Sequence, residues 1–252
     1  MSGPILEVRD LEKRYGARRA VAGVSLDVWP GEVLGIVGES GSGKTTLLSA
    51  IAGRVAPSAG SVTYDGRDLT ELADVDRSRL IGDKIGFVHQ NPRDGLRLNV
   101  SAGGNVAEKL MAAGARNYGA LRETACRWLD RVEIGRDRVD DHPSKFSGGM
   151  QQRLQIARVL ATQPQLVLMD EPTGGLDVSV QAKLLDLLRG LVDELGLAVV
   201  VVTHDLGVAR LLAHRLLVMK DGLVVEHGLT DQVLDDPAHA YTQLLVSSVL
   251  QV

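Results

Sequence analysis

Four short segments of the chain are almost continuously apolar and rich in valine, isoleucine and leucine. These segments are EVLGIVG at 32–38, KIGFVHQ at 84–90, QLVLMD at 165–170 and LAVVVVT at 197–203. Unbroken apolar runs of this length are typical of strands that are covered on both faces, as in parallel sheets. Helical patterns separate most of the runs, so the order of elements predicts an α/β fold with a mainly parallel sheet.

Three further segments show the patterns of antiparallel strands. VSLDV at 24–28 alternates apolar and polar residues, and VTYDGRDL at 62–69 contains Asp65-Gly66, a favoured hairpin turn. We expect these two segments to form a small antiparallel β-subdomain near the N-terminus. LLVMKDGLVVEHG at 216–228 predicts a closing hairpin around Asp221-Gly222.

Helical periodicity dominates residues 100–163, which we predict to form an inserted helical subdomain. One apolar helix face in this region consists of Leu121, Ala125, Trp128, Leu129 and Val132. Near the C-terminus, another helix face consists of Tyr241, Leu244, Leu245, Ser248 and Val249. We interpret this last helix as packed on its own domain, with docking of a partner as the alternative.

The composition is that of an ordinary globular protein, with 44% hydrophobic and 24% charged residues. A net charge of −4 and only 3% aromatic residues argue against a nucleic-acid partner, because such proteins carry basic surfaces or stacking platforms. The longest apolar runs, such as residues 197–202, are far shorter than the roughly 20 residues that span a bilayer. We therefore expect no direct membrane insertion. No signal peptide is visible and the single cysteine, Cys126, fits a reducing compartment, so the expected location is cytoplasmic.

The clearest chemical motif is GESGSGKT at 38–45, which matches the P-loop pattern G-x-x-x-x-G-K-[ST] without a gap. Its glycines let successive N–H groups face inward as an anion nest, and the following helix directs its positive end to the same place. Lys44 is expected to reach the β- and γ-phosphates, Thr45 to bind Mg²⁺, and Thr46 to add a phosphate contact. The predicted phosphate-binding residues are Gly38, Glu39, Ser40, Gly41, Ser42, Gly43, Lys44, Thr45 and Thr46.

A second motif, LVLMDEP at 166–172, ends a buried strand in two acidic residues. Asp170 is the candidate Mg²⁺-side carboxylate, acting through a coordinated water, and Glu171 is the candidate base that orients the attacking water. Phosphoryl transfer needs mainly positioning and charge neutralisation, which this pair of carboxylates supplies. The plainer alternative is an acidic strand end followed by a turn at Pro172, and the P-loop upstream argues against it.

The segment FSGGMQQR at 146–153 resembles the signature motif of the ABC ATPase family, which is usually written LSGGQ. Phe146 and Met150 depart from the motif at its variable edges. In physical terms, the serine would cap a helix whose first N–H groups form a second anion site. The signature residues implied by the resemblance are Ser147, Gly148, Gly149 and Gln151.

One nucleotide does not need two anion sites in the same chain. The family resemblance therefore implies a head-to-tail homodimer, in which ATP and Mg²⁺ lie between the P-loop of one chain and the signature of the other. It also implies an ABC-type P-loop ATPase core with an N-terminal antiparallel β-subdomain and an inserted helical subdomain. We divide the chain into the β-subdomain and P-loop core (1–90), the helical subdomain with the signature (91–163), the remainder of the core (164–235) and a C-terminal helical tail (236–252).

Four further positions carry the family resemblance. Tyr15 in LEKRYG resembles the aromatic residue that stacks on adenine, with plain packing as the alternative. Gln90 resembles the glutamine that senses Mg²⁺ and the reactive water, and Asp177 in GGLDVS resembles the aspartate that reaches across the dimer. His204 in VVTHD resembles the histidine that contacts the γ-phosphate. The resemblance thus implies Lys44, Gln90, Glu171 and His204 as catalytic residues, and Thr45, Gln90 and Asp170 as the Mg²⁺ site.

Within the family, almost the whole chain resembles the ATP-binding K subunits of bacterial carbon–phosphorus lyase complexes, which degrade phosphonates. The resemblance is carried by HQNPRDGLRLNVSAGGN, GARNYG, EPTGGLDVSVQAKLLDLLRGL and LTDQVLDDPAHAYTQLLVSSVL. It implies an ATPase that docks on the soluble lyase core, including its radical S-adenosylmethionine subunit, and that can be joined by the companion ATP-binding L subunit. This chain would not itself cleave the carbon–phosphorus bond. SGGMQQR and DDPAHAYTQLL also resemble the ATPases of peptide and nickel importers, which is the alternative.

Residues 91–105 are the expected docking segment in either case. Arg93, Asp94 and Arg97 offer charged anchors on a loop that Pro92 stiffens. The glycines at 95, 103 and 104 would allow a partner's backbone to approach closely. A solvent-exposed loop with an ordinary helix entry is the alternative.

Overall fold

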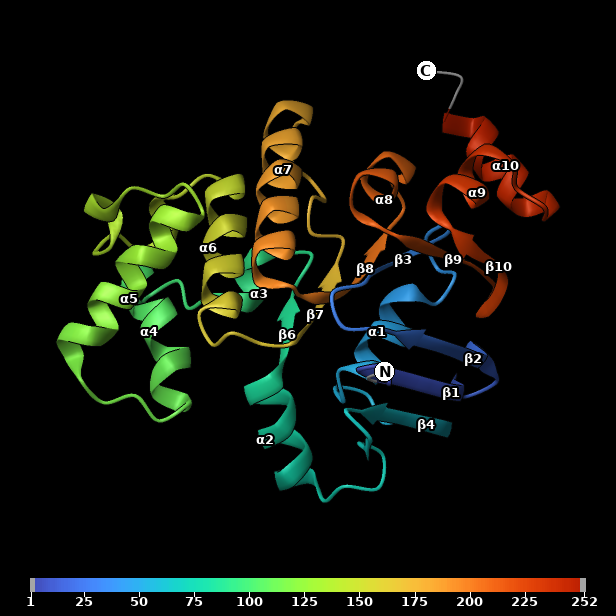
Figure 1. Ribbon diagram of the computed structural model, residues 1–252, viewed down its shortest axis with the longest axis horizontal. Helices are drawn as coiled ribbons and strands as arrows, with labels where there is room; N and C mark the ends of the chain where they lie inside the picture. Colours follow the sequence, from blue (N-terminus) through green and yellow to red (C-terminus); the bar gives the residue numbers. More distant parts are fainter. Residues whose placement is uncertain (1–2, 250–252) are drawn as a thin grey trace.

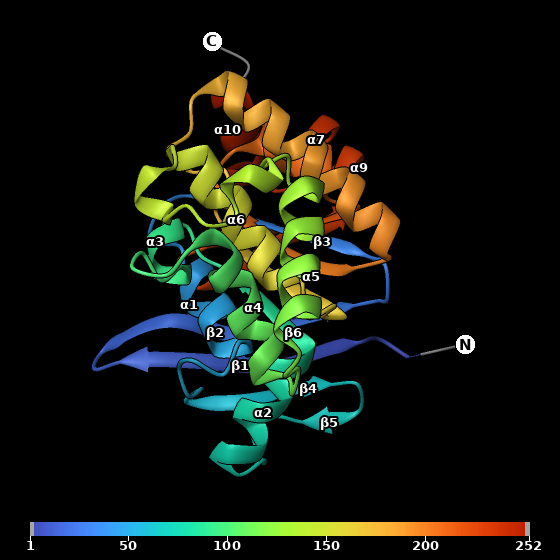
Figure 2. The ribbon, with the colours of Figure 1, turned by 90° about the vertical axis from the view of Figure 1, so that its left-hand side faces the viewer.

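The computed structural model of the protein describes residues 3–249, and two sheets form its framework (Figures 1 and 2). The smaller sheet is antiparallel, with the strand order β2-β1-β4-β5. Its strands are β1 (Leu6–Tyr15), β2 (Arg18–Val28), β4 (Ala59–Tyr64) and β5 (Arg67–Asp68). Asp65 and Gly66 form the turn between β4 and β5, as the sequence predicts, and both have positive φ angles, of 47° and 73°.

The larger sheet has the strand order β10-β9-β3-β8-β7-β6, and all its neighbours are parallel except β9 and β10. Its strands are β3 (Val33–Val37), β6 (Ile85–Val88), β7 (Leu166–Asp170), β8 (Ala198–Thr203), β9 (Arg215–Lys220) and β10 (Leu223–Leu229). The four apolar runs therefore form parallel strands of this sheet, as expected, and the hairpin at 216–228 is present as β9 and β10. The α/β fold class predicted from the sequence is confirmed.

Helices cover both faces of the larger sheet (Figure 1). Helix α1 lies between the two sheets, while α6, α7 and α8 lie on the opposite face of the larger sheet. The helices are α1 (Lys44–Ile51), α2 (Asp74–Lys84), α3 (Pro92–Gly95), α4 (Ala102–Ala112), α5 (Tyr118–Arg131), α6 (Gly148–Leu160), α7 (Val178–Leu195), α8 (Leu206–Leu212), α9 (Thr230–Asp235) and α10 (Ala240–Val249). Helices α3 to α6 fall within the segment 91–163, and α4 and α5 lie at one end of the molecule, with α6 between them and α7.

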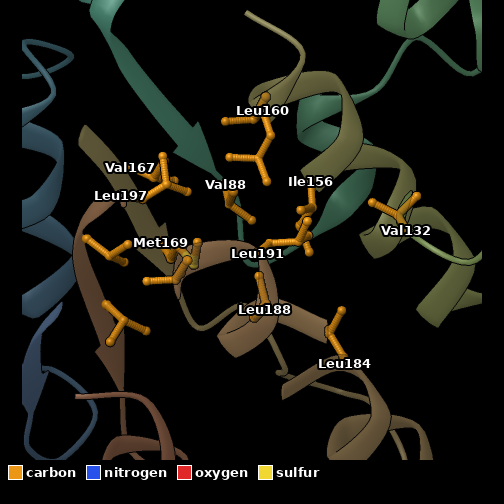
Figure 3. Packing of buried hydrophobic residues seen from close by; sticks show 14 of the residues in the cluster. Val88, Val132, Ile156, Leu160, Val167, Met169, Leu184, Leu188, Leu191 and Leu197 are labelled. Atoms are coloured by element: carbon orange, nitrogen blue, oxygen red, sulfur yellow. The ribbon is translucent and has the colours of Figure 1, made fainter. Parts of the chain in front are cut away.

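The continuous apolar runs are explained by two separate cores. Along β8, Val199 and Val201 point into the core formed with α6, α7 and α8, whereas Val200 and Val202 point into the core formed with α1 and the antiparallel sheet. Figure 3 shows the first of these cores, where Met169 of β7 meets Leu188 and Leu191 of α7. Because side chains alternate across a strand, a strand between two cores must be apolar at every position.

The C-terminal helix departs from the face expected for it. Leu244 is 63% exposed and Ser248 is also exposed, so neither belongs to the buried face. Tyr241 and Thr242 are buried, and Leu245 and Val246 are half-buried. The helix is oriented by Tyr241, which turns toward the P-loop, and this orientation leaves Leu244 in solvent.

Candidate nucleotide-binding site

The topology brings four chain segments to one edge of the larger sheet. Strands β3, β6, β7 and β8 are parallel, so their carboxyl ends lie on the same side, where ligands of α/β proteins bind. The P-loop follows β3, Gln90 follows β6, Glu171 follows β7 and His204 follows β8. A cavity of about 810 Å³ lies there and is lined by Tyr15, Arg18, Ala20, Gly38, Glu39, Ser40, Gly41, Gly43, Lys44, Thr45, Thr46, Gln90, Glu171, His204 and Leu245.

Two glycines of the P-loop are required by its path. Gly38 has a φ of +148° and Gly43 a φ of +104°, conformations that other residues rarely adopt. A β-carbon at Gly38 would clash with the carbonyl oxygen of Met219, and one at Gly43 would clash with that of Ala20. The loop can therefore pass between β2 and the end of β9 only because these positions lack a side chain.

Lys44 is held inside the loop. Its side chain is buried, with 5% of the residue exposed, and Nζ donates to the carbonyl oxygens of Gly38 at 2.7 Å and Glu39 at 2.8 Å. Burial lowers the pKa of Lys44, and the negative charges of Glu171 and Asp170 act against this shift. The ammonium group thus lies at the mouth of the loop on carbonyl oxygens that phosphate oxygens can replace.

Thr45 and Asp170 form the part of the site suited to Mg²⁺. The Thr45 hydroxyl donates to Asp170 Oδ1 at 3.1 Å, and Asp170 is 7% exposed. Burial raises the pKa of Asp170, because an ionised carboxylate is costly there without a nearby cation. Among the side chains that the structure describes, no group of three or more His, Cys, Asp and Glu residues could hold a metal ion. A hydroxyl, one carboxylate, phosphate oxygens and water are the ligands Mg²⁺ takes in nucleotide sites, so this donor set fits it.

Glu171 is the centre of a second group of side chains. Its Oε2 accepts from Gln90 Nε2 at 2.8 Å, and its Oε1 lies 3.0 Å from His204 Nδ1. The backbone at Glu171 has a φ of +42°, an uncommon value for a non-glycine residue, and its N–H donates to the carbonyl of Val202 at 2.8 Å. Backbone strain of this kind is concentrated at functional sites. Gln90 contacts Glu171 in this structure, so of the three residues expected at Mg²⁺ only Thr45 and Asp170 contact each other.

Two side chains border the open end of the cavity. Tyr15 is 52% exposed, and Lys13 Nζ lies 5.2 Å from the centre of its ring. Arg18 was not expected from the sequence; its Nη2 donates to the carbonyl of Gly41 at 3.2 Å. The half-exposed ring of Tyr15 can stack on the base of a nucleotide, and the cationic side chain of Arg18 can bind its phosphates.

The signature residues do not line this cavity. Ser147 caps α6 and accepts from the N–H of Met150 at 3.3 Å, and both Ser147 and Gly148 are exposed. Gly149 packs against α7, where a β-carbon would lie 2.5 Å from Val180 Cγ1. The chain therefore presents a second helix N-terminus on its surface, away from its own P-loop.

Two of the expected nucleotide contacts have local partners instead. The Gln151 side chain is 5% exposed and donates to the carbonyls of Pro143 at 2.9 Å and Phe146 at 3.1 Å. As placed here, it holds the segment that leads into α6 and does not face solvent. Asp177 caps α7 by accepting from the N–H of Val180 at 3.0 Å and from the Ser179 hydroxyl at 2.7 Å, and this second bond is the main cause of its lowered pKa.

The segment 91–105 is built differently from the expectation. The β-carbons that Gly95, Gly103 and Gly104 lack would meet Gln155, Val139 and Val100 of the same chain. These glycines are thus required by internal packing. Gly103 is buried and does not admit a partner's backbone, whereas close approach of a partner at Gly95 and Gly104 stays a prediction. Arg97 pairs with Glu108 at 2.6 Å, whereas Arg93 and Asp94 are exposed.

Asn105 organises this segment from inside. It is fully buried, and its Nδ2 donates to the carbonyls of Arg97, Val100 and Ser101 at 3.0–3.1 Å. Gln155 plays a similar part for the chain before Gln90: its Oε1 accepts from His89 N at 2.7 Å, and its Nε2 donates to His89 O at 3.1 Å. Since Gln155 belongs to α6, these bonds connect the signature helix to the segment that carries Gln90. Local sequence patterns gave no sign of either residue.

Comparisons with known proteins agree with this geometry. The ABC transporter family model matches residues 21–174. The phosphonates utilization ATP-binding protein PhnK of Escherichia coli (strain K12) is 66% identical over 251 residues, which cover 100% of both chains. The oligopeptide transport ATP-binding protein AmiE of Streptococcus pneumoniae is 37% identical over 259 residues, covering 98% of this chain and 73% of AmiE.

A solved structure supports the same assignment. The ATP-binding cassette MJ0796, in a dimeric post-hydrolysis state bound to ADP and Pi, is similar with a TM-score of 0.81 and 35% identity. The similarity covers 89% of this chain and 98% of the MJ0796 chain. With the P-loop, the paired acids and the capped signature helix in place, the chain belongs to the ABC transporter family and is an ATP-hydrolysing cassette.

Proposed function

We propose that this cassette is the ATPase subunit of a carbon–phosphorus lyase assembly and that closure of its ATP-bound homodimer remodels a soluble phosphonate-degrading core. The 66% identity to PhnK along the entire chain carries the phosphonate part of the proposal. Identity to the peptide transport protein AmiE is 37%, so the hypothesis that this chain serves an importer is the weaker one. Within residues 3–249, no helix is long and apolar enough to cross a membrane.

The homodimer is inferred from the separation of the two anion sites. The cavity contains the P-loop and Glu171 but none of the signature residues, while Ser147 and Gly148 are exposed on another part of the surface. Val178, at the start of α7 and close to the signature helix, is 84% exposed although it is apolar. A second copy placed head to tail would cover Val178 and supply the helix N-terminus that the cavity lacks. MJ0796 is dimeric in its post-hydrolysis state, which supports a dimer for this chain.

The side chains of the cavity then have distinct tasks. Lys44 moves from the carbonyls of Gly38 and Glu39 to phosphate oxygens. Thr45 and Asp170 would hold Mg²⁺, which would supply charge neutralisation at the phosphates. Glu171 accepts the proton of the attacking water, and Gln90 and His204 fix the direction of its carboxylate.

The proposed partners are the lyase core with its radical S-adenosylmethionine subunit and the companion ATP-binding L subunit. Arg93, which is exposed on α3 close to Gln90 in sequence, is a charged anchor available to such a core. Arg97 is a poorer anchor because Glu108 already binds it. Closure of the ATP-bound homodimer would move the helical subdomain. The hydrogen bonds of Gln155 to His89 connect that subdomain to the proposed docking segment.

The proposal is tested by affinity capture of the Glu171→Gln variant, with ATP and Mg²⁺, from cells that grow on a phosphonate as the sole phosphorus source. Lyase core subunits in the soluble fraction are the expected result, and Arg93→Glu in the same background should reduce their recovery. Arg116→Glu, which changes an exposed arginine at the distant tip of the helical subdomain, is the matched control and should leave recovery unchanged. Capture of a permease from the membrane fraction, without core subunits, would refute the assignment and favour the importer.

A further inference from the structure

The C-terminal helix α10 contacts the P-loop directly, across 202 positions of sequence. The hydroxyl of Tyr241 accepts a hydrogen bond from the N–H of Glu39 at 3.0 Å. Tyr241 is 5% exposed, and Leu245, one turn further along α10, lines the nucleotide cavity. One face of α10 therefore packs against the P-loop.

The hydrogen bond is made to a particular peptide unit. The N–H of Glu39 and the carbonyl of Gly38 belong to the same planar group. Tyr241 holds this group by its N–H, and Lys44 Nζ holds it by its carbonyl oxygen at 2.7 Å. The direction of that carbonyl, and with it the resting position of the lysine, is thus fixed from both sides.

Two neighbours contact the tyrosine, and a third residue holds the segment that leads to it. Lys220 Nζ lies 4.8 Å from the centre of the Tyr241 ring, and the Tyr241 N–H donates to His239 Nδ1 at 3.1 Å. The carboxylate of Glu226, on β10, accepts from the N–H groups of Ala238 at 2.8 Å and His239 at 3.0 Å. The entry to α10 is therefore anchored to the closing hairpin, and the hydroxyl has little freedom to leave the loop.

We propose that Tyr241 is a positioning residue for ATP binding, because its hydroxyl fixes the Gly38–Glu39 peptide on which Lys44 rests. The P-loop backbone must hold its N–H groups in one arrangement for phosphates to bind, and a glycine with a φ of +148° gives this peptide unusual freedom to rotate. Removing the hydroxyl releases one end of the peptide, so part of the binding energy is used to order the loop. This inference concerns the cassette itself and does not depend on the partner proposed above.

The test compares Tyr241→Phe with Tyr64→Phe. Tyr64 is 2% exposed and its hydroxyl donates to Gln165 at 2.9 Å, away from the cavity, so both variants lose one buried phenol hydrogen bond. Tyr241→Phe should weaken ATP affinity and raise KM by about fivefold, the usual effect of one neutral hydrogen bond, with kcat unchanged. Tyr64→Phe should keep the wild-type KM, even if its melting temperature falls as much as that of Tyr241→Phe.

Two results would overturn the inference. One is an ATP affinity in Tyr241→Phe that equals that of Tyr64→Phe, since the contact would then contribute to folding only. The other is rapid exchange of the Glu39 amide hydrogen, measured by NMR in the wild-type protein without nucleotide. The Glu39 amide should exchange at least about fivefold more slowly than in an unprotected peptide. Exchange at the unprotected rate would show that the bond to Tyr241 does not hold the loop, whether or not the variants fold.

Discussion

Substituting Glu171 by glutamine separates ATP binding from hydrolysis. In the wild type each carboxylate oxygen has its own donor-bearing neighbour, Gln90 at 2.8 Å and His204 at 3.0 Å. The side-chain amide introduced by Glu171→Gln would keep one acceptor oxygen but would place an NH₂ group against the other neighbour. It also cannot take a proton from water. Loss of a general base lowers rates by about 10²- to 10⁴-fold, which is about 2.7–5.4 kcal/mol in activation free energy.

ATP binding should survive this change. The Glu171 carboxylate is bonded to Gln90 and His204, and its negative charge faces the same cavity as Lys44. Removing that charge lessens repulsion of the phosphates, so affinity is expected to hold or to increase. Phosphate release and equilibrium ATP binding are measured side by side, with Glu194→Gln as the control. Glu194 pairs with Arg131 and is 65% exposed at the far end of α7, so its substitution should alter neither quantity. Hydrolysis by Glu171→Gln within about tenfold of the wild type would remove Glu171 from the role of base.

Two further substitutions test the local energetics. Burial raises the pKa of Asp170, so its ionised form opposes folding. Without nucleotide, Asp170→Asn should therefore be more resistant to urea than the wild type at pH 7. The difference should vanish below about pH 4, where Asp170 is protonated in both the folded and the unfolded state. A wild type that is the more stable protein at pH 7 would contradict the sign of this effect. Asn105→Ala removes the donor from three part-buried backbone carbonyls and should lower the free energy of unfolding by about 2–4 kcal/mol in urea titrations. A loss below about 0.5 kcal/mol would deny Asn105 its organising role.

The sequence predicts those features that depend on local order. The apolar runs, whose side chains point into two cores, identify β3, β6, β7 and β8. The Asp-Gly turns identify the hairpins β4–β5 and β9–β10. The P-loop, Asp170 and Glu171 follow from the same reasoning, because they stand directly after strands whose parallel arrangement brings their ends together.

Contacts between distant segments are the features that the sequence does not show. Tyr241 reaches Glu39 across the fold, and Gln155 reaches His89 from another helix; neither bond has a local pattern. The direction in which a side chain points is likewise set by tertiary packing. Gln151 turns inward to two carbonyls, and Gly103 is required by Val139 rather than by a partner.

If each ATPase site is shared between two chains, two variants that are inactive alone should restore activity when they are mixed. Lys44→Ala destroys the P-loop, and Ser147→Arg blocks the exposed signature. Alone, each variant should be inactive, because every site in its homodimer is broken. In an equal mixture, half of the dimers should pair the intact P-loop of one variant with the intact signature of the other. Hydrolysis should therefore recover to about a quarter of the wild-type rate per chain. A mixture no more active than its two components would contradict a site built from two chains.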